Sequence, residues 1–106
     1  MIIKKQKINI CVIGLGYVGL PIALKLAKKF KVLGYDINQN RILELQKGID
    51  SNSKIKFHDF KKKNINFTYS KKKLKNCNFF IITVPTPVTK NNRPDLKYLK
   101  NASILV

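Results

Sequence analysis

Acidic side chains are scarce in this sequence: five Asp and Glu residues stand against 22 Lys and Arg residues, for a formal net charge of +17. Such a balance is common in proteins that bind nucleic acids or anionic membranes. The basic residues here are nearly all lysine, however, and they form separate clusters at 28–29, 61–63 and 71–73. Together with the abundance of Asn and Ile, this pattern is typical of an AT-rich coding bias. We therefore expect no nucleic-acid partner.

Long apolar runs are also absent. No run approaches the ~20 residues that a membrane-spanning helix needs, and the N-terminal MIIKKQKINI lacks the apolar core and cleavage site of a secretory signal. We expect a cytoplasmic location and no membrane partner. The sequence has only two cysteines, Cys11 and Cys77, and their spacing is not that of metal ligands. This spacing favours two buried, reduced thiols on neighbouring strands and no metal site.

Three of the five glycines stand together in one motif, at Gly14, Gly16 and Gly19, directly after the apolar run 8–13. The run predicts a parallel strand buried on both faces, and the residues after the glycines predict a helix over Tyr17–Phe30. In such a motif the first glycine permits a tight turn, the second lets a pyrophosphate approach the backbone, and the third lets the helix pack closely on the strand. The positive end of the helix then faces the anion. Helical spacing predicts the face of this helix that packs on the sheet: Val18, Ile22, Leu26 and Phe30.

A second predicted strand, Val32–Asp36, ends in an acid 22 positions after Gly14. A carboxylate near this spacing accepts hydrogen bonds from the adenosine ribose hydroxyls, and it disfavours the 2′-phosphate of NADP. The motif and the acid together predict a site for NAD. A helix over Gln39–Lys47 follows, with Asn38 as its N-cap. It carries Arg41, for which two positions remain open: a contact to the adenosine, or a solvated place on the helix surface.

Two further strands are predicted at Ile65–Tyr69 and Asn78–Val84, with a short helical turn at Lys71–Asn76 between them. A last helix begins with Asp95 as its N-cap. This order of elements predicts an α/β fold, a doubly wound parallel sheet with about four strands in the order 3-2-1-4. Residues 1–106 then form part of a Rossmann-type dinucleotide-binding domain.

The loop after the fourth predicted strand is the other candidate part of the site. In open α/β sheets, ligands bind beyond the carboxyl ends of the strands, next to the first strand. Thr86 lies in this loop between Pro85 and Pro87, and we expect it to contact the ligand. Thr83 is a second candidate for a polar contact, but because it still lies within the predicted strand, an in-strand hydroxyl is the preferred expectation for it.

The motifs GLGYVGLP, GYDINQNRI and FFIITVPTPV followed by NRPDL resemble the UDP-glucose/GDP-mannose dehydrogenase family. VPTP and PDL are most similar to its UDP-N-acetylglucosamine and UDP-N-acetylgalactosamine 6-dehydrogenases of capsule and O-antigen synthesis. The resemblance covers essentially the whole chain, and it implies oxidation of the sugar C6 alcohol to a carboxylate in successive NAD-dependent steps. The residues that it places at the cofactor are Gly14, Gly16, Tyr17, Val18, Gly19, Asp36, Arg41 and Thr86.

The same resemblance implies an enzyme with more parts than this chain has. Neither Cys11 nor Cys77 aligns with the catalytic cysteine of the family, and the sugar-binding domain and dimer helix lie beyond residue 106. We therefore expect no catalytic residue and no turnover in this chain alone, with a UDP-sugar substrate and a homodimer only at full length. The alternative is a stand-alone nucleotide-binding or regulatory module. Steep salt dependence of binding would instead indicate a nucleic-acid binder.

Overall fold

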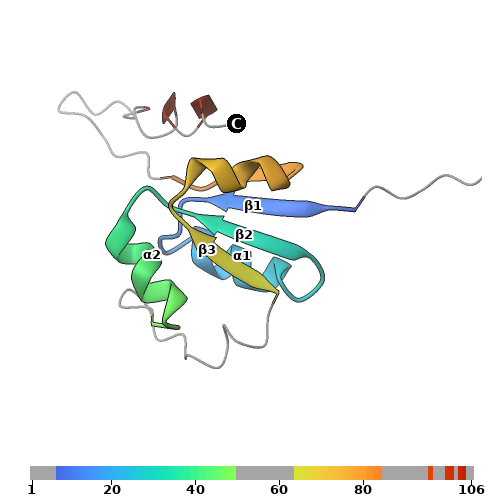
Figure 1. The fold of residues 1–106 in the computed structure, drawn as a ribbon, viewed down its shortest axis with the longest axis horizontal. Helices are drawn as coiled ribbons and strands as arrows, with labels where there is room; N and C mark the ends of the chain where they lie inside the picture. The colour runs from blue at the N-terminus through green and yellow to red at the C-terminus, as the bar shows by residue number, and fades with distance from the viewer. Residues whose placement is uncertain (1–6, 50–63, 85–95, 97–99, 102, 105–106) are drawn as a thin grey trace, which may run out of the picture.

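The computed structural model describes residues 7–49, 64–84, 96, 100–101 and 103–104. The strands form one parallel sheet in the order β3-β2-β1-β4, as predicted (Figure 1). Each predicted strand and the short helical turn are present, with ends shifted by up to two residues. The elements in chain order are β1 (Asn9–Ile13), α1 (Gly19–Leu26), β2 (Lys31–Tyr35), α2 (Gln39–Gln46), β3 (Ile65–Thr68), the 3₁₀ helix η1 (Lys71–Asn76) and β4 (Phe79–Ile82).

The central strand β1 is apolar throughout its buried part because both faces of the sheet are covered. Successive residues of a strand point to opposite faces. Ile10 and Val12 pack into the cluster that holds the buried side of α1 and α2. Cys11 and Ile13 point to the other face, where Leu74 of η1 covers them.

Helix α1 is shorter than predicted, and its predicted buried face is only partly right: Leu26 and Phe30 pack against the core, but the fully buried residues are others. It begins at Gly19 and its α-helical part ends at Leu26. Val18 is 62% exposed, while Ile22, Leu26 and Phe30 are only half-buried. The residues of this helix that are buried against the sheet are Gly19, Leu20, Ala23 and Leu24.

The physical reason for this rotation is the close approach of Gly19 to the sheet. A Cβ at Gly19 would overlap the carbonyl oxygen of Gly14 and the hydroxyl of Thr83. Gly19 must therefore face inward, and residues one turn further along the helix follow it. Hydrophobic spacing alone favoured the larger side chains, but at the point of closest approach only glycine permits the contact.

Helix α2 begins as predicted and ends at Gln46, one residue before the predicted end. The side chain of Asn38 accepts a hydrogen bond from the N–H of Arg41 at 3.2 Å, which caps the N-terminus. Gly48 follows the helix with a φ of +79°, the left-handed conformation that often ends a helix.

Both cysteines are free thiols, as predicted, but only Cys11 lies on a strand, because Cys77 is the C-cap of η1 and stands two residues before β4. Cys11 is fully buried, and the half-buried Cys77 packs against the cluster that contains it. Burial and the nearby Cys77 raise the pKa of the Cys11 thiol to about 12.

In the C-terminal part, the N–H of Lys100 donates to the carbonyl of Leu96 at 2.9 Å, in agreement with a helix there. The predicted N-cap Asp95 lies outside the described residues. None of the helices in the described parts is both long and apolar enough to cross a membrane.

Candidate functional site

The glycine turn between β1 and α1 lies at the carboxyl ends of three neighbouring strands. Gly14 begins the turn with a φ of +96°, and its N–H donates to the carbonyl of Tyr35, the last residue of β2, at 2.8 Å. A Cβ at Gly14 would lie 3.0 Å from the carbonyl carbon of Thr83. The positive φ and the crowding together require glycine here.

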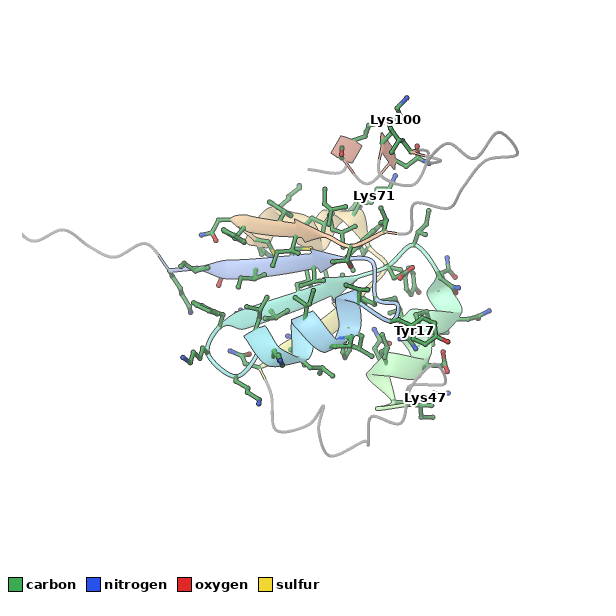
Figure 2. All side chains as sticks on the ribbon, turned by 180° about the vertical axis from the view of Figure 1, so that it is seen from behind. Tyr17, Lys47, Lys71 and Lys100 are labelled. Carbon is green, nitrogen blue, oxygen red and sulfur yellow. The ribbon has the colours of Figure 1, made fainter. Side chains whose placement is uncertain are left out.

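Beyond Gly14 the chain opens toward solvent. A Cβ at Gly16 would meet no atom within 4 Å, and Tyr17 and Val18 are 75% and 62% exposed. The N–H groups of these three residues donate to no other described residue, and Val18 caps α1 without a side-chain hydrogen bond. Figure 2 shows Tyr17 at this end of α1, on the side of α2. Free N–H groups at the positive end of a helix are the arrangement that binds anions.

The carboxylate of Asp36 is held beside this turn by two backbone N–H groups. Its Oδ2 accepts from the N–H of Leu15 and its Oδ1 from the N–H of Asn38, both at 2.9 Å. These bonds orient the carboxylate and tie the glycine turn to the end of β2. Because an ionised carboxylate has about four acceptor sites, it keeps capacity for the hydroxyls of a ribose.

Arg41 is buried, with 7% of its surface exposed, so the solvated alternative is wrong. Its Nε–H donates to the carbonyl oxygen of Leu15 at 2.8 Å. Arg41 therefore reaches from α2 to the glycine turn itself. Asp36 and Arg41 hold the N–H and the C=O of the same residue.

Thr83 is part of the site, so the preferred expectation of an in-strand hydroxyl is wrong. Its hydroxyl lies 2.6 Å from the carbonyl oxygen of Gly14 and 3.1 Å from that of Ile13, and it donates to the nearer one. Thr83 follows β4, and it bonds to the turn instead of acting as an in-strand hydroxyl. The available signal was a single polar residue at the end of the apolar run FFIITV.

Thr86 lies outside the described residues, so its contact to a ligand stays a prediction. Among the described residues, no group of three His, Cys, Asp or Glu side chains is arranged to hold a metal ion.

The strand order, the glycine turn at a helix N-terminus and the carboxylate after the adjacent strand define a Rossmann-type dinucleotide-binding domain. Comparison with protein families specifies this further. Residues 8–106 match the NAD-binding domain of the UDP-glucose/GDP-mannose dehydrogenase family, and the chain belongs to that family.

Curated relatives and solved structures agree with this assignment. The chain is 46% identical over 99 residues to the UDP-N-acetyl-D-glucosamine 6-dehydrogenase of Pseudomonas aeruginosa, covering 92% of this chain and 24% of that protein. It is 47% identical over 95 residues to Protein CapL of Staphylococcus aureus, covering 90% and 22%. The structure of a UDP-D-ManNAc dehydrogenase from Pyrococcus horikoshii superposes with a TM-score of 0.86 at 35% identity, covering 93% of this chain and 25% of that one. The chain thus spans about a quarter of the length of these relatives.

Proposed function

We propose that this chain binds NAD for a nucleotide-sugar 6-dehydrogenase that oxidises a UDP-N-acetylhexosamine to the uronic acid. The observation that carries the proposal is that the carboxylate of Asp36 lies beside the start of α1, where the N–H groups of Gly16, Tyr17 and Val18 donate to no other described residue. The name of the first relative supports a UDP-N-acetylhexosamine as the substrate. The name CapL supports a role in capsule synthesis. A role in O-antigen synthesis and a cytoplasmic location belong to the same proposal.

Each group of residues has a part in this site. The N–H groups at the start of α1 bind the pyrophosphate, and the carboxylate of Asp36 accepts the ribose hydroxyls. Bound NAD supplies the hydride acceptor, while the chain's own residues bind and orient it. The residues that we assign to the cofactor are Gly14, Gly16, Tyr17, Val18, Gly19, Asp36, Arg41 and Thr86.

We assign no residue of this chain to the oxidation of the sugar. Cys11 is buried between sheet and η1, and burial keeps its thiol protonated by raising its pKa to about 12. A nucleophilic cysteine needs the opposite, an exposed thiol with a lowered pKa. The UDP-sugar and a homodimeric partner are therefore proposed for the full-length enzyme.

Calorimetric titration of the chain with NAD and NADP tests the cofactor part. We expect NAD to bind, and NADP to bind more weakly because its 2′-phosphate meets the carboxylate of Asp36. A folded chain that binds neither nucleotide, or that binds both equally, would contradict the assignment. A nucleic-acid binder would instead show steep salt dependence without competition by NAD.

The substrate part is tested on the protein that carries this domain, with NADH absorbance as the readout. We expect oxidation of UDP-N-acetylglucosamine or another UDP-N-acetylhexosamine. Turnover of UDP-glucose or GDP-mannose alone would move the enzyme to another branch of the family and leave the NAD site intact.

A further inference from the structure

We propose that Thr83 is a positioning residue for ribose recognition, because its hydroxyl fixes the peptide group that in turn orients the carboxylate of Asp36. That peptide group joins Gly14 to Leu15 in the glycine turn. The inference rests on the proposed NAD site, in which Asp36 accepts the ribose hydroxyls. It assigns to Thr83 a role that acts through the backbone of the turn.

The peptide between Gly14 and Leu15 lies across the end of β1, the strand between β2 and β4. Its carbonyl oxygen accepts from the hydroxyl of Thr83, after β4, at 2.6 Å. Its N–H donates to Oδ2 of Asp36, after β2, at 2.9 Å. The carbonyl and the N–H of a trans peptide lie in one plane and point in opposite directions, and no cis peptide is present among the described residues. One rigid group therefore connects Thr83 to Asp36.

Side chains bind this peptide because the backbone ladder of the sheet ends one peptide earlier. There, the N–H of Thr83 donates to the carbonyl of Ile13 at 2.8 Å. On the other side, the N–H of Gly14 donates to the carbonyl of Tyr35, also at 2.8 Å. Successive peptides of a regular strand alternate in direction, but Gly14 has a φ of +96° and the next peptide points the same way. The hydroxyl of Thr83 thus replaces a backbone donor, and the carboxylate of Asp36 replaces a backbone acceptor.

The single proton of the Thr83 hydroxyl is directed to the carbonyl of Gly14. The hydroxyl oxygen also lies 3.1 Å from the carbonyl oxygen of Ile13, but that carbonyl already accepts from the N–H of Thr83. No backbone N–H of another described residue donates to the Gly14 carbonyl. Within the described part of the chain, the hydroxyl is therefore the donor that sets the rotation of this peptide.

The space around the hydroxyl admits a small donor and little else. A Cβ at Gly19 would overlap the hydroxyl oxygen of Thr83, so this group lies between the start of α1 and the carbonyl of Gly14. A methyl group could not replace it at 2.6 Å from the carbonyl oxygen, because non-bonded carbon contacts are about 3.5–4.0 Å. Serine would keep the donor in this space, and alanine would remove it without adding bulk.

The consequence for ribose recognition follows from what holds the carboxylate of Asp36. It accepts from the N–H of Leu15 in a partly buried setting and from the N–H of Asn38 at the surface. Without the hydroxyl of Thr83, the peptide can rotate, because the glycine on its N-terminal side populates many backbone conformations. The bond from Leu15 then weakens. The carboxylate must be ordered when the ribose binds, which lowers the affinity for the ribose hydroxyls.

Two nucleotides isolate the contribution of the ribose hydroxyls. ADP carries both hydroxyls, 2′,3′-dideoxy-ADP lacks them, and the adenine and pyrophosphate are the same. Each is titrated calorimetrically into the 106-residue chain, and the readout is the ratio of the two dissociation constants. A loosened pyrophosphate site changes both affinities and cancels in this ratio. For the wild type, we expect ADP to bind about tenfold more tightly, the size of a hydrogen bond to a charged group.

Thr83→Ala and Thr83→Ser are a matched pair that differs by one hydroxyl. For Thr83→Ala, we expect the ratio to fall roughly three- to tenfold, the cost of ordering one side chain on binding. For Thr83→Ser, we expect a ratio close to wild type, because the donor is kept. Thr68→Ala is the control, since Thr68 is a buried threonine at the end of β3 whose hydroxyl accepts from the N–H of Ser70 at 3.0 Å. It should leave the ratio unchanged.

Three results would overturn the inference. They are an unchanged ratio in a folded Thr83→Ala variant, a loss in Thr83→Ser as large as in Thr83→Ala, or the same loss in Thr68→Ala. Weaker binding of both nucleotides at an unchanged ratio would leave Thr83 with a structural role only.

If Thr83→Ala does not fold, as judged by circular dichroism, Thr83→Cys decides, because a thiol is a weak donor. A reduced ratio in that variant supports the role, and a wild-type ratio contradicts it. A failure of the proposed function looks different. In that case the wild-type chain itself binds neither nucleotide, or binds both equally, and Asp36 is not the ribose acceptor.

Discussion

Replacement of Asp36 by Ala should destabilise the chain even when no cofactor is present. The carboxylate accepts two backbone hydrogen bonds of 2.9 Å, from Leu15 in a partly buried setting and from Asn38 at the surface. Bonds to a charged group contribute about 1.5–3 kcal/mol when shielded from water and less when exposed. We expect a total loss of about 2–3 kcal/mol in the free energy of unfolding. For a domain of this size that is roughly 10–20 °C in the melting temperature.

The assay is urea unfolding followed by circular dichroism, with thermal unfolding as a second probe. Asp36→Asn keeps one acceptor oxygen and should lose about half of this stability, because its NH₂ group faces one of the two donors. Glu44→Gln is the matched control, since it also removes one acid, from the middle of α2 and away from the turn. It should change the free energy of unfolding by less than about 0.5 kcal/mol.

Replacement of Asp36 should also affect NAD binding. We expect Asp36→Ala to weaken NAD binding by about 1–3 kcal/mol. Part of that loss comes from the loosened glycine turn. A folded Asp36→Ala variant with wild-type stability would refute the reasoning, because the carboxylate would then not hold Leu15. Unchanged NAD affinity in that variant would leave Asp36 as a structural residue only.

Four other predictions concern the same turn and the sheet beneath it. Gly16→Ala should fold with near wild-type stability, since its Cβ meets no neighbour, but bind NAD weakly. Gly19→Ala should lose about 1–3 kcal/mol by overpacking in urea unfolding, and equal stability of the two variants would contradict the packing argument. Thr83→Val should cost about 1–2 kcal/mol by leaving the Gly14 carbonyl without its donor, whereas Thr83→Ser should cost less. The raised pKa of Cys11, about 12, means that the folded state holds this proton more tightly. Stability should therefore fall by up to about 1.4 kcal/mol per pH unit above ~pH 8.5, and a Cys11→Ser variant should lack this part of the slope.

The sheet and its order were predictable because local patterns suffice for them. An apolar run such as NICVI must be buried on both faces, and alternating strands and helices with right-handed crossovers permit few topologies. Gly14 and Asp36 were found from spacing alone, since a tight turn and an acid after the adjacent strand mark this fold. The N-cap Asn38 and the glycine after α2 also follow from local chemistry.

The rotation of α1 was not predictable from hydrophobic spacing. Val18, Ile22, Leu26 and Phe30 form the more apolar stripe, but the contact of Gly19 with Gly14 and Thr83 decides which side faces the sheet. The contact with Thr83 joins residues that are far apart in the sequence. Periodicity within one helix contains no information about it.

By itself, the sequence determined that this chain has a dinucleotide-binding fold with a glycine turn and a ribose carboxylate. Only the tertiary structure decided how that turn is held. The N–H of Leu15 donates to Asp36 after β2, and its carbonyl accepts from Arg41 on α2. The hydroxyl of Thr83, after β4, donates to the carbonyl of Gly14. The physical reason is that backbone carbonyls and N–H groups are the same in every residue. Their partners are therefore selected by the distances that folding creates, and the identity of the side chains does not reveal them.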